Sequence, residues 1–225
     1  MARRALPITA AAFATTAALL LTACGGGGDS SSDDIKGADT GSSSPSASAS
    51  ASASPAADRP DVSLPEDLDL VFDFEKPSDT DSAAALADAE NYIRALNHGI
   101  TEQNPDDPAF QYYSAGDAAR YANSQIKEYV KGGWTLTGTD RYYRAETSAA
   151  GDSKTVKLVN VTFCEDQSKV FGKEVKSGKV LESENAEGSA ANYLKFSLVM
   201  ASAKSSPVWR AQQITVTEKA TECKE

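Results

Sequence analysis

The sequence has little of what metal sites and serine-hydrolase active sites are built from. Of its 225 residues, one is histidine (His98) and three are cysteines (Cys24, Cys164 and Cys223). No pair of these residues has the spacing of a zinc site, and no G-x-S-x-G nucleophile motif accompanies the histidine. We therefore expect no metal, no cofactor and an exposed histidine without a catalytic role.

Basic residues and long apolar runs are also scarce. The chain has 22 Lys and Arg against 32 Asp and Glu, a net charge of −10 at pH 7. A chain this acidic lacks the clustered basic residues that nucleic-acid binding requires, so nucleic acid is excluded as a partner. After Cys24 no apolar run approaches the roughly 18 residues of a membrane-spanning helix.

The first 24 residues have the layout of an export signal. Arg3 and Arg4 precede an apolar stretch over residues 5–21, and small residues lead to Cys24. The closing sequence Leu21-Thr22-Ala23-Cys24 resembles the signal of bacterial lipoproteins, which are cut before the cysteine. The resemblance implies that residues 1–23 are a signal peptide and that Cys24 is the lipid attachment site. An ordinary cleaved signal is the alternative.

The lipoprotein resemblance further implies at least two acyl chains, such as palmitate, on Cys24. A buried methylene contributes about 0.8 kcal/mol, so two chains hold durably where one is marginal. The lipid bilayer would then be a partner, and the expected location is the extracytoplasmic face of the cell membrane. Residues 24–63 would be a disordered linker, because 28 of the 39 residues from Gly25 to Ser63 are Gly, Ser, Ala or Pro.

If Cys24 carries lipid, Cys164 and Cys223 remain as an even pair in an oxidising compartment. A disulfide between them would close a span of 59 residues, which contributes about 4 kcal/mol in the chain-entropy estimate. The alternative is a buried free thiol at Cys164 and an exposed one at Cys223. We favour the disulfide.

Residues 64–225 are expected to form a single globular domain. Residues 64–77 alternate as one short strand or extended segment. Apolar spacing predicts a helix from about Ser82 to His98, capped by Asp81 or Ser82. A second helical region begins near Pro108, with Ser114 and Asp117 as a capping-box-like start, and stops at Gly132-Gly133.

From Trp134 onward the pattern has period two, which predicts strands over residues 134–146, 155–165, 192–201 and 208–218. Phase slips between Leu158 and Val159 and between Ala211 and Ile214 predict β-bulges, which bend a sheet. A Ser177-Gly178 turn predicts a shorter hairpin. The fold class is therefore α+β, with N-terminal helices packed on a curved antiparallel sheet.

This layout resembles the cone-like fold of the ketosteroid isomerase and nuclear transport factor two superfamily. Three stretches also resemble a group of actinobacterial lipoproteins of undefined function, and this likeness covers residues 64–225. They are VFDFEKP at 71–77, KGGWTLTGTDRYYR at 131–144 and TFCEDQSKVFGKEVKSGK at 162–179. The superfamily resemblance implies a cavity in which enzymes place an acid/base carboxylate and tyrosines. The positions that match are Asp140 with Tyr142 or Tyr143, and Tyr112 or Tyr113 at the helix edge.

Two functions follow from these observations. The first is a membrane-anchored, non-enzymatic binding module for an unknown protein or small molecule. A cavity lined by one face of residues 192–201 (Leu194, Phe196, Leu198 and Met200), with no buried carboxylate, would support it. The alternative is an isomerase- or hydrolase-like enzyme, which needs Asp140 buried beside a tyrosine hydroxyl in a substrate-sized pocket, with a raised pKa.

One cluster of basic residues interrupts the acidic chain, at Lys169, Lys173, Lys176 and Lys179. Lysines on a hairpin prevent edge-to-edge pairing of strands, and this is the interpretation we favour. The other interpretation is a contact with an anionic wall polymer or lipid headgroup.

Overall fold

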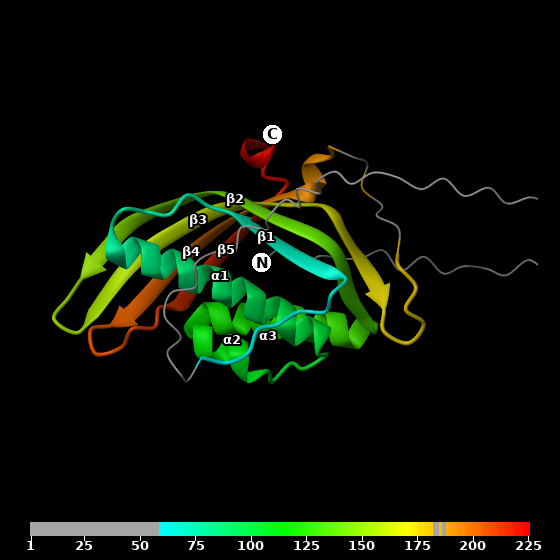
Figure 1. Ribbon diagram of the computed structural model, residues 1–225, viewed down its shortest axis with the longest axis horizontal. Coiled ribbons are helices and arrows are strands. Elements are labelled where there is room, and N and C mark those ends of the chain that lie inside the picture. Colours follow the sequence, from blue (N-terminus) through cyan, green and yellow to red (C-terminus); the bar gives the residue numbers. More distant parts are fainter. Residues whose placement is uncertain (1–58, 182–184, 186–187) are drawn as a thin grey trace, which may run out of the picture. The chain divides into compact units, whose positions relative to one another are not determined.

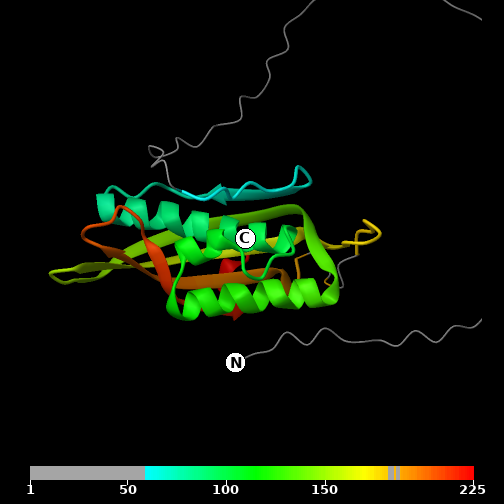
Figure 2. The same cartoon turned by 90° about the horizontal axis from the view of Figure 1, so that it is seen from below.

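Five strands form one sheet in the order β1-β2-β3-β4-β5. The computed structural model describes residues 59–181, 185 and 188–225. The strands are β1 (Leu68–Asp73), β2 (Trp134–Asp152), β3 (Val156–Glu174), β4 (Tyr193–Ala203) and β5 (Arg210–Glu218). The helices are α1 (Thr80–Thr101), α2 (Pro108–Tyr113) and α3 (Gly116–Gly132), with short 3₁₀ turns η1 (Ala190–Asn192) and η2 (Thr221–Cys223). The three helices cover one face of the curved sheet (Figure 1, Figure 2).

This arrangement confirms the predicted α+β class with helices packed on a curved sheet. The neighbours from β2 to β5 pair antiparallel, as the meander predicts. β1 pairs with β2 in parallel, with Leu70 opposite Asp140 and Phe72 opposite Tyr142. A parallel pair needs a long crossover connection, and the three helices between β1 and β2 supply it.

Helix α1 begins two residues before the predicted start. Asp79 is its N-cap and accepts a hydrogen bond from the backbone nitrogen of Ser82 at 2.8 Å, so the predicted caps Asp81 and Ser82 lie inside the helix. The predicted apolar face is buried against the sheet. The Tyr92 hydroxyl donates to the carbonyl of Ala118 at 2.9 Å, which joins α1 to α3.

The predicted capping box at Ser114 and Asp117 is wrong. Ser114 ends α2, and its hydroxyl donates back to the carbonyl of Phe110. Helix α3 starts at Gly116 without a side-chain cap, because its N-cap residue is Ala115, which has no side-chain acceptor. The backbone nitrogen of Ala115 donates to the carbonyl of Ala211 on β5 at 2.8 Å. The predicted glycine stop is confirmed, since Gly133 ends α3 with a φ of 70°.

One predicted bulge is confirmed and the other lies in a different strand. On β5, Val199 of β4 pairs with Gln213 and the next residue, Met200, pairs with Ala211, so Gln212 is the extra residue. At the other slip, the register shifts between Ala149 and Gly151, so β2 holds the extra residue and β3 does not. The phase slip in β3 therefore predicted where along the strand pair the bulge lies, but the extra residue is on the partner strand β2.

The entry of the chain into the domain is fixed by a buried carboxylate on α1. Asp88 is 2% exposed and pairs with Arg59. It also accepts from the backbone nitrogen of Trp209 at 2.8 Å and from the side chain of Asn91 at 3.2 Å. One carboxylate thus joins the first described residue, α1 and the start of β5.

Candidate functional site

Two carboxyl groups and a tyrosine hydroxyl meet inside the core, on the helix-covered face of the sheet. The Tyr142 hydroxyl donates to Oδ2 of Asp140 at 2.7 Å and lies 3.1 Å from Oε1 of Glu165. Asp140 and Tyr142 lie two residues apart on one face of β2, and Glu165 is the β3 partner directly opposite Tyr142. Each of the three is at most 3% exposed. We call them the acid pair and its tyrosine.

Burial and mutual repulsion keep the acid pair from ionising fully. Burial raises the pKa of Asp140 well above its ordinary value, and the negative charge of Glu165 raises it further. Burial also raises the pKa of Tyr142, so the hydroxyl stays a donor. Two carboxyls in one dry site cannot both carry charge at neutral pH. Burial and repulsion therefore favour the protonated form of Asp140.

Aromatic rings enclose this polar group. The ring of Phe72 stacks on Tyr142 with centroids 4.8 Å apart, and Phe163 and Phe196 approach it edge-on at 5.9 and 6.4 Å. Oδ1 of Asp140 is buried without a hydrogen-bond partner among the described residues. The arrangement meets the predicted burial, tyrosine contact and raised pKa, but the two open hollows described next are lined by other residues.

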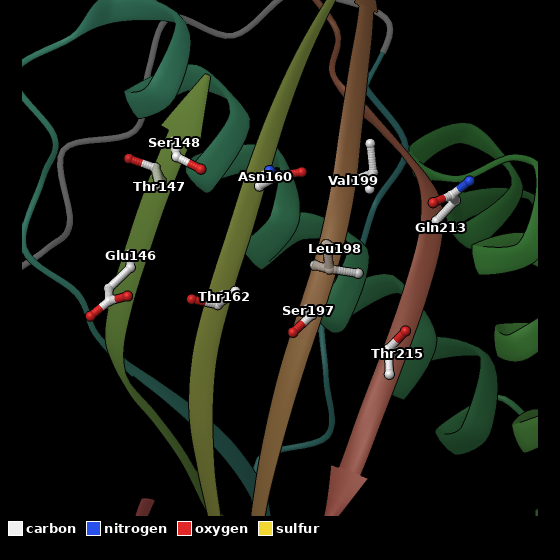
Figure 3. A pocket seen from close by; sticks show the side chains of 10 residues that line it. All are labelled: Glu146, Thr147, Ser148, Asn160, Thr162, Ser197, Leu198, Val199, Gln213 and Thr215. Carbon is white, nitrogen blue, oxygen red and sulfur yellow. The ribbon is translucent and has the colours of Figure 1, made fainter. Parts of the chain in front are cut away.

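Part of the other sheet face forms a hollow of about 360 Å³ that we call the outer groove. Its residues come from β2, β3, β4 and β5, and most of their side chains lie on the side of the sheet away from the helices (Figure 3), whereas Leu198 belongs to the buried face. Hydroxyl and amide groups dominate it, and Glu146 is its one charged residue. The lining residues are Glu146, Thr147, Ser148, Asn160, Thr162, Ser197, Leu198, Val199, Gln213 and Thr215.

A second hollow, of about 590 Å³, contains the histidine. Nδ1 of His98 lies 3.0 Å from Oδ2 of Asp107, whose other oxygen accepts from the backbone of Ala109 at 2.7 Å. The His98 side chain is 18% exposed. The predicted exposure of His98 is therefore wrong, because the turn after α1 brings Asp107 back beside it. Such a contact fixes which ring nitrogen carries the proton.

The other predicted tyrosines do not join the acid pair. Tyr143 faces away from Tyr142, and its hydroxyl donates to the carbonyl of Cys223. The Tyr113 hydroxyl lies 3.4 Å from Arg59, and the Tyr112 ring packs edge-on against Tyr113 at 4.9 Å. These three tyrosines pack against neighbouring residues, and two of them also contact residues near the two ends of the described chain, Arg59 and Cys223.

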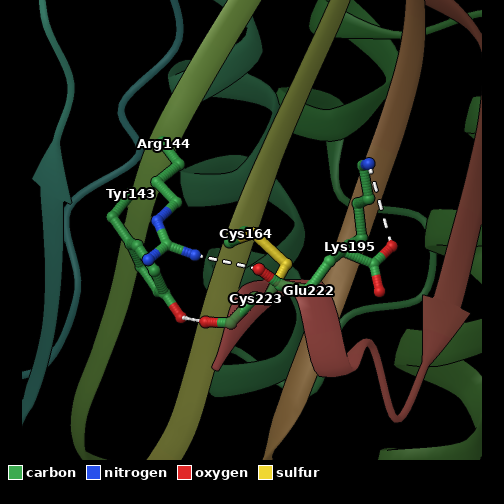
Figure 4. The surroundings of a disulfide bond; sticks show 6 residues. All are labelled: Tyr143, Arg144, Cys164, Lys195, Glu222 and Cys223. Carbon is green, nitrogen blue, oxygen red and sulfur yellow. Dashed lines mark hydrogen bonds and ion pairs between the residues drawn. A yellow bond between two sulfur atoms is a disulfide. The ribbon is translucent and has the colours of Figure 1, made fainter. Parts of the chain in front are cut away.

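Cys164 on β3 and Cys223 on η2 form a disulfide, with Cα atoms 5.5 Å apart (Figure 4). This is the pairing that the cysteine count favoured. Both cysteines are buried in a small cluster with three neighbours on the outer face (Tyr143, Tyr193 and Ala220). Arg144 donates to the carbonyl of Glu222 at 2.9 Å. The end of the chain is thereby held on the outer sheet face.

Sequence reasoning missed Glu165 and placed the apolar face of β4 in an open cavity. Leu194, Phe196, Leu198 and Met200 do share one buried face, but helices pack on it, and the same face holds the buried acid pair. A signal for Glu165 was present. Val161 and Phe163 precede it at alternate positions of β3, so the period of two puts an acid on an apolar face.

Some predicted features lie outside the described residues, namely Cys24, the signal peptide and most of the linker. Within the described ranges, no group of three or more His, Cys, Asp or Glu side chains could hold a metal ion. Over the same ranges, none of the helices is both long and apolar enough to cross a membrane.

Comparisons with known proteins give little information on family. No family model matches the chain, and neither does a curated protein. The crystal structure of the intermembrane space region of chloroplast protein ARC6 aligns with 60% of this chain and 96% of that chain. The identity is 12% and the TM-score is 0.35, values at which the alignment carries no argument.

Proposed function

We propose that this chain is a lipid-anchored extracytoplasmic protein whose folded domain is a binding module. Three features support the placement. The sequence from Arg3 to Cys24 has the layout of a lipoprotein signal, the following residues have the composition of a tether, and the domain holds a buried disulfide. Disulfides persist in oxidising compartments outside the cytoplasm.

The single observation that carries the binding role is the outer groove. The opposite sheet face is filled by helices, whereas β2 to β5 present the groove to solvent (Figure 3). Neutral donors and acceptors such as Asn160, Thr162 and Gln213 suit a polar, uncharged ligand surface, for example a peptide backbone or hydroxylated small molecule. In this proposal the groove binds and does not catalyse.

We also propose, on the resemblance of its sequence, that the domain belongs with the actinobacterial lipoproteins of undefined function and with the cone-like superfamily. Under that proposal the acid pair supports a second candidate function, an isomerase- or hydrolase-like enzyme. The specific observation in its favour is the contact between Tyr142 and Asp140, whose pKa is raised. That enzyme needs an opening of the core beside Asp140, because this carboxyl is 3% exposed.

Site-specific photo-crosslinking in the native membrane tests the binding role. A photoreactive residue replaces Asn160 in the groove, and a matched control replaces Glu66, which is exposed outside the groove. We expect one discrete adduct from position 160 and none from position 66. The Ser197→Trp variant fills the groove and should abolish the adduct. An adduct that persists in this variant, or equal labelling from both positions, would exclude the groove as the binding site.

A further inference from the structure

The turn that follows β3 exposes apolar side chains. Val175 and Val180 are 47% and 48% exposed, more than any other large hydrophobic residue among those described. The backbone of this turn is nevertheless ordered, because the Glu174 and Lys179 backbones are joined at 2.9 Å and Gly178 donates to the Glu174 carbonyl at 2.9 Å. We call residues 175–180 the hairpin tip. It lies at one end of the sheet in both views (Figure 1, Figure 2).

Lysines accompany the two valines on the hairpin tip. Lys176 and Lys179 are both exposed, and no acid within 4.0 Å pairs with either of them in the part of the chain that the structure describes. The nearest acid of the turn, Glu174, accepts a hydrogen bond from the Ser177 hydroxyl at 2.7 Å. The tip therefore combines exposed positive charge with apolar surface in a chain whose net charge is −10.

Protection of a strand edge does not explain the whole surface of the hairpin tip. β4 pairs with β3 only as far as Asp166, so the later residues of β3 extend past β4 and carry Lys169 and Lys173. After the turn the chain pairs back onto the end of β3, with Val180 bridged to Lys173, so Lys179 also lies at this short edge, where a lysine blocks pairing with another chain. Lys176 lies in the turn itself, and edge protection accounts neither for its exposure nor for that of the two valines.

We infer that the hairpin tip is a contact surface for an anionic phospholipid bilayer. This inference rests on the proposed function, because the acyl anchor would keep the domain near the membrane. Each lysine close to an anionic surface strengthens binding by about fivefold, and the valines can enter the interface with their exposed apolar surface. An anchored domain needs only a weak contact of this kind, since tethering raises the effective concentration of the bilayer.

The partner follows from charge complementarity and from the valines together. A soluble polyanion would use the lysines alone, whereas a bilayer uses both side-chain types. Three acids follow in the chain at Glu182, Glu184 and Glu187, within the region that is not described. They oppose binding to an anionic surface, so their replacement by Gln should strengthen it.

Vesicle co-sedimentation of the unacylated mature chain tests the inference separately from the anchor. The chain begins at residue 24 with Cys24→Ser and is mixed with vesicles of phosphatidylglycerol or of phosphatidylcholine. We expect binding to phosphatidylglycerol alone. The Lys176→Glu/Lys179→Glu variant should bind at least about 25-fold more weakly, and the matched pair Lys154→Glu/Lys219→Glu should lose clearly less, although its net charge is the same.

The Val175→Ser/Val180→Ser variant completes the test, with an expected loss of about tenfold. Circular dichroism confirms that each variant is folded. Equal losses in the two lysine pairs, or no binding of the parent chain to phosphatidylglycerol, would overturn the inference. Unchanged binding of the valine variant would also overturn it, in favour of a soluble polyanion. None of these results depends on acylation of Cys24, so a failure here and a failure of the anchor are distinguishable.

Discussion

Tyr142 donates a hydrogen bond to Asp140 at 2.7 Å inside the core, among aromatic rings. The contact lies where these two residues of β2 meet a second acid, Glu165, from the neighbouring strand. Burying these carboxyls costs free energy, because desolvation disfavours their charged form. The stability of the domain therefore depends on pH at the place where a buried carboxyl lies beside a tyrosine hydroxyl.

The acid pair should make the domain less stable as the pH rises. The pKa of Asp140 is higher in the folded chain than in the unfolded chain. Its contribution to the free energy of unfolding is therefore complete below about pH 4, and it is lost as the pH rises through the pKa of the folded state. Asp140→Asn should flatten this slope and stabilise the domain at pH 8 by about 1–3 kcal/mol. Urea unfolding between pH 5 and pH 8 measures both effects.

The exposed acid Asp69 supplies the control for this experiment, and Asp69→Asn should leave the slope unchanged. Glu90, whose pKa burial raises to about 7, adds a slope of the same sign to every variant, so each is compared with the parent chain. A parent slope of the opposite sign, or an equal slope in Asp140→Asn, would refute the account of the pair.

Gly138 is expected to be the least replaceable glycine of β2. Its φ is +100°, and a Cβ atom there would lie 2.2 Å from the carbonyl oxygen of Lys169. Gly138→Ala should cost at least about 2 kcal/mol of unfolding free energy, because backbone must move. Gly151→Ala is the matched control on the same strand, since its Cβ would meet Leu158 at an ordinary 3.6 Å. Similar denaturation midpoints for the two variants would contradict this.

The pair of partly exposed Arg59 and buried Asp88 should contribute far more stability than a surface ion pair. Asp88→Ala also removes the acceptor of the Trp209 backbone, so we expect a loss of about 3–5 kcal/mol. Once Asp88 is gone, Arg59→Ala should cost less than about 0.5 kcal/mol more. Arg120→Ala breaks an exposed pair with Asp117 and should cost under about 1 kcal/mol. Additive losses in the double-mutant cycle would show that Arg59 and Asp88 do not act together.

The disulfide should contribute about 4 kcal/mol, as expected for the span of 59 residues it closes. Replacing both Cys164 and Cys223 by Ser should therefore lower the urea midpoint strongly and speed amide hydrogen exchange in η2. Intact mass before and after reduction gives an independent check, because reduction of one bridge raises the mass by two hydrogen atoms. A mass that does not change on reduction would mean that the isolated protein contains no bridge.

Much of the fold was predictable because its helices and strands carry a clear period. The stripe on α1 and the alternation on β4 each bury one face, and Gly133 has the positive φ that its position after a helix predicts. The parallel pairing of β1 was not predictable, since a strand's partner depends on where the crossover returns. Ser114 failed as a cap because it ends α2, where its hydroxyl donates to the carbonyl of Phe110, and the N-cap position of α3 falls on Ala115.

The site was predictable only in part, for a similar reason. Asp140 and Tyr142 are two residues apart on one strand, so their common face follows from the sequence. Glu165 joins them through the register between β2 and β3, and that register includes a shift between Thr139 and Arg141. Asp107 reaches His98 through a turn, and the outer groove draws on four strands. Contacts of this kind depend on tertiary arrangement and leave no local pattern.

Intact-mass analysis of the chain isolated from its own membranes tests the central proposal most directly. The account predicts a mature form that begins at Cys24 and carries the mass of at least two acyl chains on that residue. A mature form with any other first residue, or one with Cys24 unmodified, would contradict it.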